Sequence, residues 1–135
     1  MPEFVIPYYP TVAACVVLGV LVIIQILVAD VAGIGAGHVP GMPVTTGHES
    51  FHFRATRAHA NTNENLALFV LLTIAAILLG AEPTWTNRFV GVFVASRAVH
   101  MLAYYGDVRV LRSAVFLIGL ICLVALAVCA AMALR

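Results

Sequence analysis

The sequence is poor in charge, and its cations are of one kind. Only 10% of its 135 residues are charged, and all seven basic residues are arginines because the chain contains no lysine. With a formal net charge of +1, it has no basic footprint of the kind that nucleic-acid-binding proteins carry, so we expect no nucleic-acid partner. The hydrophobic share of 63% and the mean hydropathy of +1.07 exclude an ordinary water-soluble domain of this size.

Cysteine is also scarce, and its placement argues against a disulfide framework. The chain has three cysteines, and Cys15, Cys122 and Cys129 all lie within apolar stretches. Free cysteine in such surroundings behaves as a small apolar side chain. We therefore expect these three residues to pack between helices rather than to form disulfides or redox centres.

Four apolar runs are long enough to cross a membrane, which takes about 20 mostly apolar residues per helix. They cover residues 11–29, 66–81, 89–105 and 114–134. Glycines and prolines in residues 31–43 indicate a loop after the first run. The sequence therefore predicts an all-α fold, a single domain of residues 1–135 that forms an integral membrane four-helix bundle. We expect its helices at approximately 8–30, 50–80, 87–106 and 112–134.

The arginines also suggest an orientation in the membrane. An even number of helices places both termini on one side and the first and third loops on the other. The side of these two loops carries four arginines, which are Arg54, Arg57, Arg109 and Arg112. The side of the termini carries Arg88 and Arg135. Because positive charge is concentrated in cytoplasmic loops, we expect loops one and three in the cytoplasm and both termini outside.

A polar stretch, Arg57 to Asn65 (RAHANTNEN), stands directly before the second apolar run. At about 100° per residue, four polar side chains near this stretch fall within a quarter of the helix circumference. They are Arg54, Arg57, Asn61 and Glu64. Ionisable side chains at the start of a bilayer helix are costly to keep, so they indicate a functional site.

The third apolar run carries a second polar face, formed by Arg97, His100 and Tyr104. A buried arginine at mid-bilayer costs about 2.5–3.5 kcal/mol, so we expect a partner for Arg97. Glu64 is the only carboxylate inside a predicted spanning helix, and we predict that the two form an ion pair. Contacts of this kind can also hold membrane helices together without any chemistry, which is the structural alternative.

Together these faces predict one pocket, with Arg112 and Ser113 at the start of the last helix on the same side. We expect it to be lined by Arg57, Asn61, Glu64, Arg97, His100, Tyr104 and Arg112. Arginines bind carboxylates bidentately, and a glutamate accepts hydrogen bonds from an ammonium group. Such a pocket suits a small anionic zwitterion, while apolar outer walls would admit a lipid-soluble co-substrate.

These residues resemble the membrane-associated proteins in eicosanoid and glutathione metabolism, the MAPEG family. Three motifs carry the resemblance: residues 57–65 (RAHANTNEN), residues 97–104 (RAVHMLAY) and residues 111–113 (LRS). The first is similar to the helix-two signature of the microsomal glutathione transferases. The other two are similar to stretches of the prostaglandin E synthase branch. The resemblance extends from Arg54 to the C-terminus.

The resemblance implies a homotrimer with one glutathione between adjacent subunits near the cytoplasmic side. It implies a glutathione transferase, with peroxidase activity as a further reaction, that acts on lipophilic electrophiles or lipid hydroperoxides from the bilayer. By position it implies glutathione binding by Arg57, Asn61, Glu64, Arg97, His100 and Tyr104. It further implies that Arg112 stabilises the thiolate, with Ser113 beside it as a hydrogen-bond donor.

The chain departs from the family pattern at three places. Ala60 stands where the prostaglandin synthase branch has a further glutathione-binding arginine, and no arginine or lysine precedes Arg54. The interval from Tyr104 to Arg112 is one residue shorter than in that branch. Arg109 is therefore an alternative for the thiolate role.

Three other functions compete with this interpretation. The sequence His48-Glu-Ser-Phe-His52 fits the H-E-x-x-H zinc motif, but no third ligand is evident, so we predict no metal site. A small multidrug transporter would carry a carboxylate inside its first helix, where this chain has Gln25. The main alternative is a non-catalytic lipid-binding membrane protein that resembles the lipoxygenase-activating protein.

Overall fold

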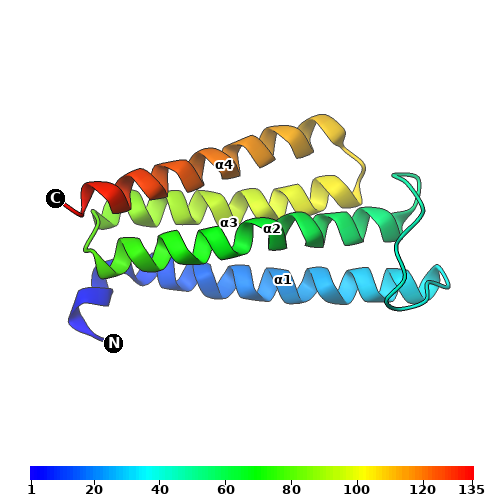
Figure 1. Ribbon diagram of the computed structural model, residues 1–135, viewed down its shortest axis with the longest axis horizontal. Coiled ribbons are helices and arrows are strands. Elements are labelled where there is room, and N and C mark those ends of the chain that lie inside the picture. The colour runs from blue at the N-terminus through cyan, green and yellow to red at the C-terminus, as the bar shows by residue number, and fades with distance from the viewer.

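The computed structural model describes all 135 residues and consists of four long helices that lie side by side (Figure 1). A short 3-10 helix, η1 (Glu3–Tyr8), leads directly into α1 (Tyr9–Gly35). The other three helices are α2 (Phe51–Leu78), α3 (Pro83–Tyr105) and α4 (Arg109–Met132). The chain forms no strand, and the predicted all-α four-helix fold is confirmed.

The helices are arranged around α3, which packs against α1, α2 and α4. In contrast, α1 and α4 do not contact each other. Both termini lie at one end of the bundle (Figure 1). The long loop 36–50 and the short turn between α3 and α4 lie at the other end, so residues on either side of these connections can meet there.

Three segments are long and apolar enough to cross a membrane: Glu3–Gly35, Phe51–Leu78 and Arg109–Met132. The fourth helix, α3, is not among them, although 23 residues at 1.5 Å each give it a length of about 34 Å. Its buried Arg97 and His100 lower its hydropathy. Because the other three helices cover α3, these polar side chains lie inside the bundle rather than against lipid.

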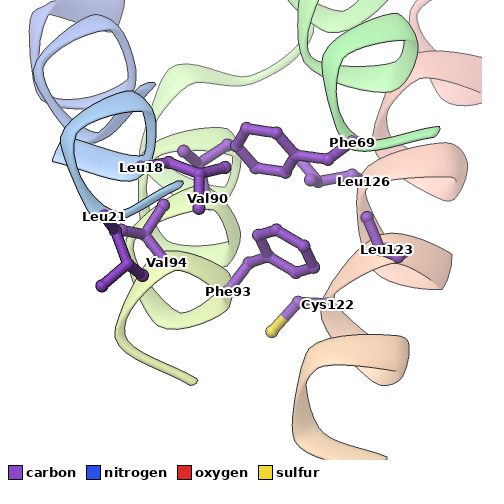
Figure 2. Packing of buried hydrophobic residues seen from close by; sticks show 9 residues of the cluster. All are labelled: Leu18, Leu21, Phe69, Val90, Phe93, Val94, Cys122, Leu123 and Leu126. Carbon is purple, nitrogen blue, oxygen red and sulfur yellow. The ribbon is translucent and has the colours of Figure 1, made fainter. Parts of the chain in front are cut away.

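The apolar core lies between all four helices (Figure 2). The rings of Phe69 on α2 and Phe93 on α3 stack at its centre, with centroids 4.5 Å apart and planes 12° from parallel. The full cluster is Leu18, Leu21, Phe69, Val90, Phe93, Val94, Cys122, Leu123 and Leu126. Cys122 packs here as a free thiol. This cluster fixes α2, α3 and α4 relative to one another, and the polar residues discussed below lie on the same three helices.

The first helix is longer than predicted, because the loop expected from residue 31 begins only after Gly35. Glycines usually indicate loops, but Gly33 lies within α1, where it packs closely against α2. A Cβ atom at this position would stand 3.1 Å from Nε2 of the buried His52 on α2. The chain leaves the helix at Gly37, whose φ of +66° is a conformation that glycine adopts readily.

The third helix begins at Pro83, earlier than the predicted residue 87, because Glu82 caps it. Its carboxylate accepts hydrogen bonds from the backbone N–H groups of Thr84 at 3.1 Å and Trp85 at 2.9 Å. Proline at the first helical position has no N–H that needs a partner. The cap therefore satisfies two of the donors that a helix start leaves free.

The Glu82 cap makes stability depend on pH. Hydrogen bonds from the Trp85 and Thr84 amides hold the pKa of the Glu82 carboxyl below its usual value. A carboxyl with a lower pKa in the folded state stabilises the fold above its unfolded pKa, and this contribution disappears as pH falls through the folded pKa. We expect Glu82→Ala to lower the thermal midpoint of detergent-solubilised protein at neutral pH but not in strong acid.

The matched control for this measurement is the exposed Glu3, and Glu3→Ala should leave the midpoint unchanged at both pH values. A deficit of Glu82→Ala that is equally large in acid would show that the ionised cap does not supply this stabilisation.

Candidate functional site

Arg97 is the largest side chain that is fully buried, with 1% of its surface exposed. Its Nη1 donates to Oδ1 of Asn61 at 3.1 Å, and its Nη2 donates to the backbone oxygen of Val115 at 3.5 Å. The rings of Phe93 and Phe116 lie 5.4 and 5.7 Å from its Cζ. An amide, a carbonyl and two aromatic faces therefore stabilise this cation.

The predicted ion pair between Arg97 and Glu64 is wrong. Glu64 is exposed, and the carboxylate contacts within ion-pair distance in the chain are those of Asp107, to Arg109 and to the His48 imidazole, which is an ion pair only when His48 is protonated. The reason is the helix phase. At about 100° per residue, Glu64 lies about 160° around α2 from the centre of its buried face, whereas Asn61 lies at the edge of that face. Asn61 thus reaches Arg97 and Glu64 does not.

Space for the Arg97 guanidinium comes from a glycine on the opposing helix. A Cβ atom at Gly119 of α4 would lie 2.6 Å from Nη2 of Arg97 and 2.9 Å from Oγ of Ser96. Gly119 thus lets α4 approach α3 closely where α3 carries its largest buried cation.

An open pocket of about 230 Å³ lies beside Arg97, between α2, α3 and α4. Its lining residues are Asn61, His100, Tyr104, Arg112, Ser113 and Phe116. All of these except Phe116 are among the predicted site residues. Arg97 does not line the pocket, but its hydrogen bond to Asn61 connects it to a residue that does.

Aromatic contacts order the interior of this pocket. The His100 ring meets the Tyr104 ring edge-on at 5.0 Å, and Cζ of Arg112 lies 4.5 Å from the centroid of the Tyr104 ring. His100 is 2% exposed, and its Nδ1 makes no hydrogen bond within the chain. A guanidinium, an imidazole ring, a phenol and an amide therefore line one small volume.

Arg109 contacts Asp107 outside the pocket, and Ser113, which lines the pocket, uses its hydroxyl hydrogen within α4. Nη2 of Arg109 lies 3.6 Å from Oδ2 of Asp107, and Arg109 does not line the pocket. Oγ of Ser113 donates to the backbone oxygen of Arg109 at 3.2 Å. Of the two arginines considered for the thiolate role, Arg112 is the one at the pocket.

Arg57 and Glu64 do not join the pocket of their own chain. Both side chains are exposed on the flank of α2, and neither lines the cavity. The expectation that one chain gathers them with Tyr104 and Arg112 is therefore wrong. Arg57 and Glu64 can contribute to a binding site only if a second protein surface packs against α2.

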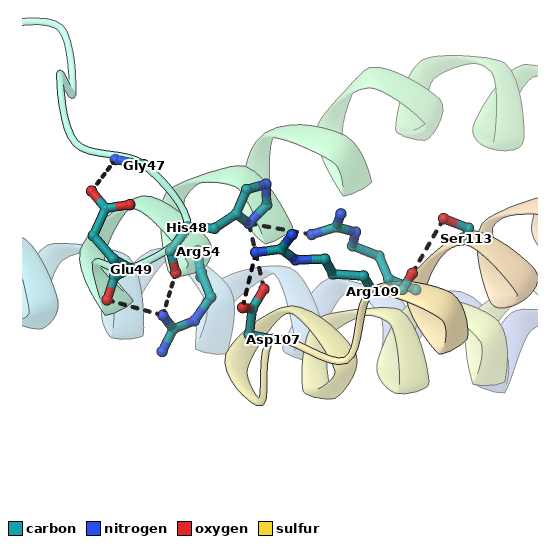
Figure 3. Close-up of polar contacts among 8 residues, drawn as sticks. Gly47, His48, Glu49, Arg54, Asp107, Arg109 and Ser113 are labelled. Carbon is teal, nitrogen blue, oxygen red and sulfur yellow. Dashed lines mark hydrogen bonds and ion pairs between the residues drawn. The ribbon is translucent and has the colours of Figure 1, made fainter.

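Two pocket neighbours were not expected from the sequence, Phe116 and His48. Phe116 lies one helical turn after Arg112 on α4, and this spacing could have indicated it. His48 belongs to the long loop, and its Nδ1 lies 3.4 Å from Nη1 of Arg112 and 3.6 Å from Oδ1 of Asp107 (Figure 3). No local sequence signal reports this contact, because it joins residues 64 positions apart.

The zinc interpretation of His48 to His52 has no structural support. Ser50 is the N-cap of α2, so His48 precedes the helix and the two imidazoles do not share a helical face. His52 instead packs against His38, with ring centroids 4.7 Å apart. No three His, Cys, Asp or Glu side chains are grouped so that they could hold a metal ion.

A larger pocket of about 630 Å³ lies between the end of α1, the long loop and the start of α2. Its polar lining includes Asp30, His38, His52 and His59, and none of the predicted site residues reaches it. We place the candidate site in the smaller pocket because its lining residues come from three helices and include Arg112.

Comparison with known families gives one result. The model described as "MAPEG family" matches residues 11–132 of this chain, which include every residue of the pocket and all four helices except the first two residues of α1. Comparison with curated proteins finds no match.

The packing of Gly119 leads to a stability prediction. Gly119→Ala places a methyl group against Arg97 and Ser96, and overpacking of this kind costs about 1–3 kcal/mol. We expect a lower thermal midpoint in detergent, because the guanidinium must move away from Asn61 or α4 must move away from α3.

Gly19 on α1 is the matched control, since a Cβ atom there meets nothing within 4 Å. Gly19→Ala should be neutral or slightly stabilising. Equal midpoints for the two variants would contradict the close approach of α4 to Arg97.

Proposed function

The chain belongs to the MAPEG family, whose model matches residues 11–132, and we propose that it is a membrane-bound glutathione transferase. Glutathione is the proposed co-substrate, and glutathione-dependent peroxidase activity is the proposed second reaction. The observation that carries the proposal is the pocket in which Asn61, His100, Tyr104 and Arg112 converge from three helices.

The chemistry of the pocket fits part of a glutathione molecule. Glutathione offers carboxylates, an ammonium group, amides and a thiol. Arg112 supplies a cation, Asn61 supplies an amide, and His100 and Tyr104 supply an imidazole ring and a phenol. A volume of about 230 Å³ falls below the range of about 300–1,000 Å³ typical of small-molecule sites. One chain therefore supplies only part of the proposed site.

A second copy of the chain is the proposed source of the remainder. Arg57 and Glu64 are exposed on α2 at the start of its membrane-spanning segment, where uncovered charges are costly. In the proposed homotrimer, the flank of α2 with these two side chains lies against the pocket of a neighbouring subunit. Arg57 and Glu64 then bind the charged ends of glutathione across the interface.

The proposed chemistry centres on Arg112. A cation close to a thiol lowers the thiol pKa, and each unit of pKa corresponds to about 1.4 kcal/mol. The thiolate attacks the electrophilic carbon of an apolar substrate, a C–S bond forms, and the leaving group departs with its electron pair. With a lipid hydroperoxide, the thiolate attacks the terminal oxygen and the O–O bond breaks. This yields an alcohol and a glutathione sulfenic acid, which a second glutathione converts to the disulfide.

The orientation that we propose follows from the arginines at the pocket end of the bundle. Arg54, Arg57, Arg109 and Arg112 lie on this side, so the pocket faces the cytoplasm, where positive charge is concentrated. The apolar outer faces of the helices let lipophilic substrates reach the pocket from the bilayer.

The first test measures glutathione binding and activation by purified protein in detergent. We expect calorimetry to detect binding, and an aryl halide assay to detect conjugation. Arg112→Ala should raise the pKa of the bound thiol by about one to three units and lower turnover, as followed by the ultraviolet absorbance of the thiolate. Arg109→Ala is the matched control and should leave the thiol pKa unchanged, because Arg109 faces Asp107.

Two results would contradict the proposed function. If Arg112→Ala and wild type titrate alike, Arg112 does not stabilise the thiolate. If the wild-type protein binds lipid but neither binds nor conjugates glutathione, the non-catalytic lipid-binding alternative replaces the transferase.

The second test asks whether neighbouring subunits share the site. Glu64→Gln and Arg112→Ala should each reduce conjugation when expressed alone. In mixed oligomers, Glu64 of one subunit can meet Arg112 of its neighbour, so co-expression should restore part of the activity. If both residues had to come from the same chain, no mixed oligomer would recover activity, and the shared site would be excluded.

A further inference from the structure

One nitrogen atom of His48 lies between two groups of opposite charge. Nδ1 is 3.4 Å from Nη1 of Arg112 and 3.6 Å from Oδ1 of Asp107. Arg112 is only a donor, and the Asp107 carboxylate is an acceptor. Nδ1 can therefore accept from Arg112 when it carries no proton, or donate to Asp107 when it carries one, but it cannot do both.

We propose that His48 is a positioning residue that holds the Arg112 guanidinium at the pocket through its unprotonated Nδ1. The proposal deepens the proposed function and rests on it, because it assigns a control to the arginine that stabilises the thiolate. His48 itself does not line the pocket and acts through Arg112.

The surroundings of His48 hold its imidazole in place. Nη1 of Arg54 donates to the His48 backbone oxygen at 2.5 Å and to that of Glu49 at 3.3 Å. The Phe53 ring meets the imidazole edge-on at 5.1 Å, and the Tyr104 ring lies nearly parallel to it at 6.3 Å. Figure 3 shows the resulting arrangement, with His48 above the turn that carries Asp107. The long loop is thereby attached to α2 and faces the start of α4.

The distances favour the arrangement in which Nδ1 accepts a hydrogen bond from Arg112. Nδ1 lies 3.4 Å from Nη1 of Arg112, within hydrogen-bond distance, and 3.6 Å from Oδ1 of Asp107, beyond it. The same guanidinium lies over the Tyr104 ring at 4.5 Å. Two contacts, one to an imidazole nitrogen and one to an aromatic face, therefore restrain its position.

Asp107 is the competing partner, and the backbone holds it in place. Its φ of +52° is a left-handed conformation that aspartate tolerates better than most residues. The backbone N–H of Asp107 donates to the oxygen of Tyr104 at 3.1 Å, which closes the end of α3. If Nδ1 gains a proton, His48 turns to this carboxylate and Arg112 loses its acceptor.

The experiment compares His48→Leu, which removes the acceptor, with His48→Asn, whose side-chain oxygen can take the place of Nδ1. With His48→Leu we expect the bound glutathione thiol pKa to rise by about one unit, which means about tenfold less thiolate below that pKa. The glutathione dissociation constant and KM should change little while kcat falls. His48→Asn should restore most of the thiolate. His38→Leu, a histidine of the same loop outside the pocket, should match wild type.

A second measurement needs no glutathione. In protein labelled with nitrogen-15 histidine, Arg112→Ala should shift the Nδ1 resonance of His48, and Arg88→Ala should not, because Arg88 lies over Trp85 near the start of α3. The inference is overturned if Arg112→Ala leaves this resonance unchanged, if His48→Leu leaves the thiol pKa unchanged, or if His48→Asn behaves like His48→Leu. If the wild-type protein does not lower the pKa of the bound thiol, the proposed function is wrong. The positioning role of His48 is then wrong as well, even if the resonance shows that His48 contacts Arg112.

Discussion

The position of one buried guanidinium determines how α2, α3 and α4 fit together at the pocket. Arg97 donates hydrogen bonds to Asn61 and Val115 and is flanked by two phenylalanines, so all three helices contribute to its surroundings. Gly119 lets α4 come close enough for this. Because an unsatisfied cation is so costly inside a membrane bundle, these contacts restrict the register of the helices, and the pocket lies at the edge of this arrangement.

Most of the fold could be predicted from the lengths of the apolar runs, since a spanning helix has few alternatives in lipid. The ends of the helices were less predictable. Gly33 lies within α1 where His52 leaves little room for a Cβ atom, and Glu82 begins α3 by capping it. Neither contact follows from composition. The predicted end of α1 and the predicted start of α3 were therefore wrong. Both helix ends depend on where a nearby side chain lies.

The sequence predicted which residues form the candidate site better than it predicted how these residues are arranged. Helical periodicity grouped Arg97, His100 and Tyr104 on one face, and these residues do lie together on the buried side of α3. Periodicity also grouped Arg57, Asn61 and Glu64, but it could not say where the bundle lies relative to that stripe. Only Asn61 turns out to lie at the edge of the buried face. The contact of His48 with Arg112 depends on how a long loop folds back, which no local pattern encodes.

The shared location of the two termini has a practical consequence. Both chain ends lie at one end of the bundle, away from the turn between α3 and α4 (Figure 1). At that end the hydroxyl of Tyr8 donates to the Ala81 backbone, and Asn87 contacts Thr11. Consecutive copies can therefore be fused head to tail by linkers that never have to traverse the bilayer. Such a tandem protein fixes the order of subunits genetically, so each altered residue can be assigned to a chosen copy.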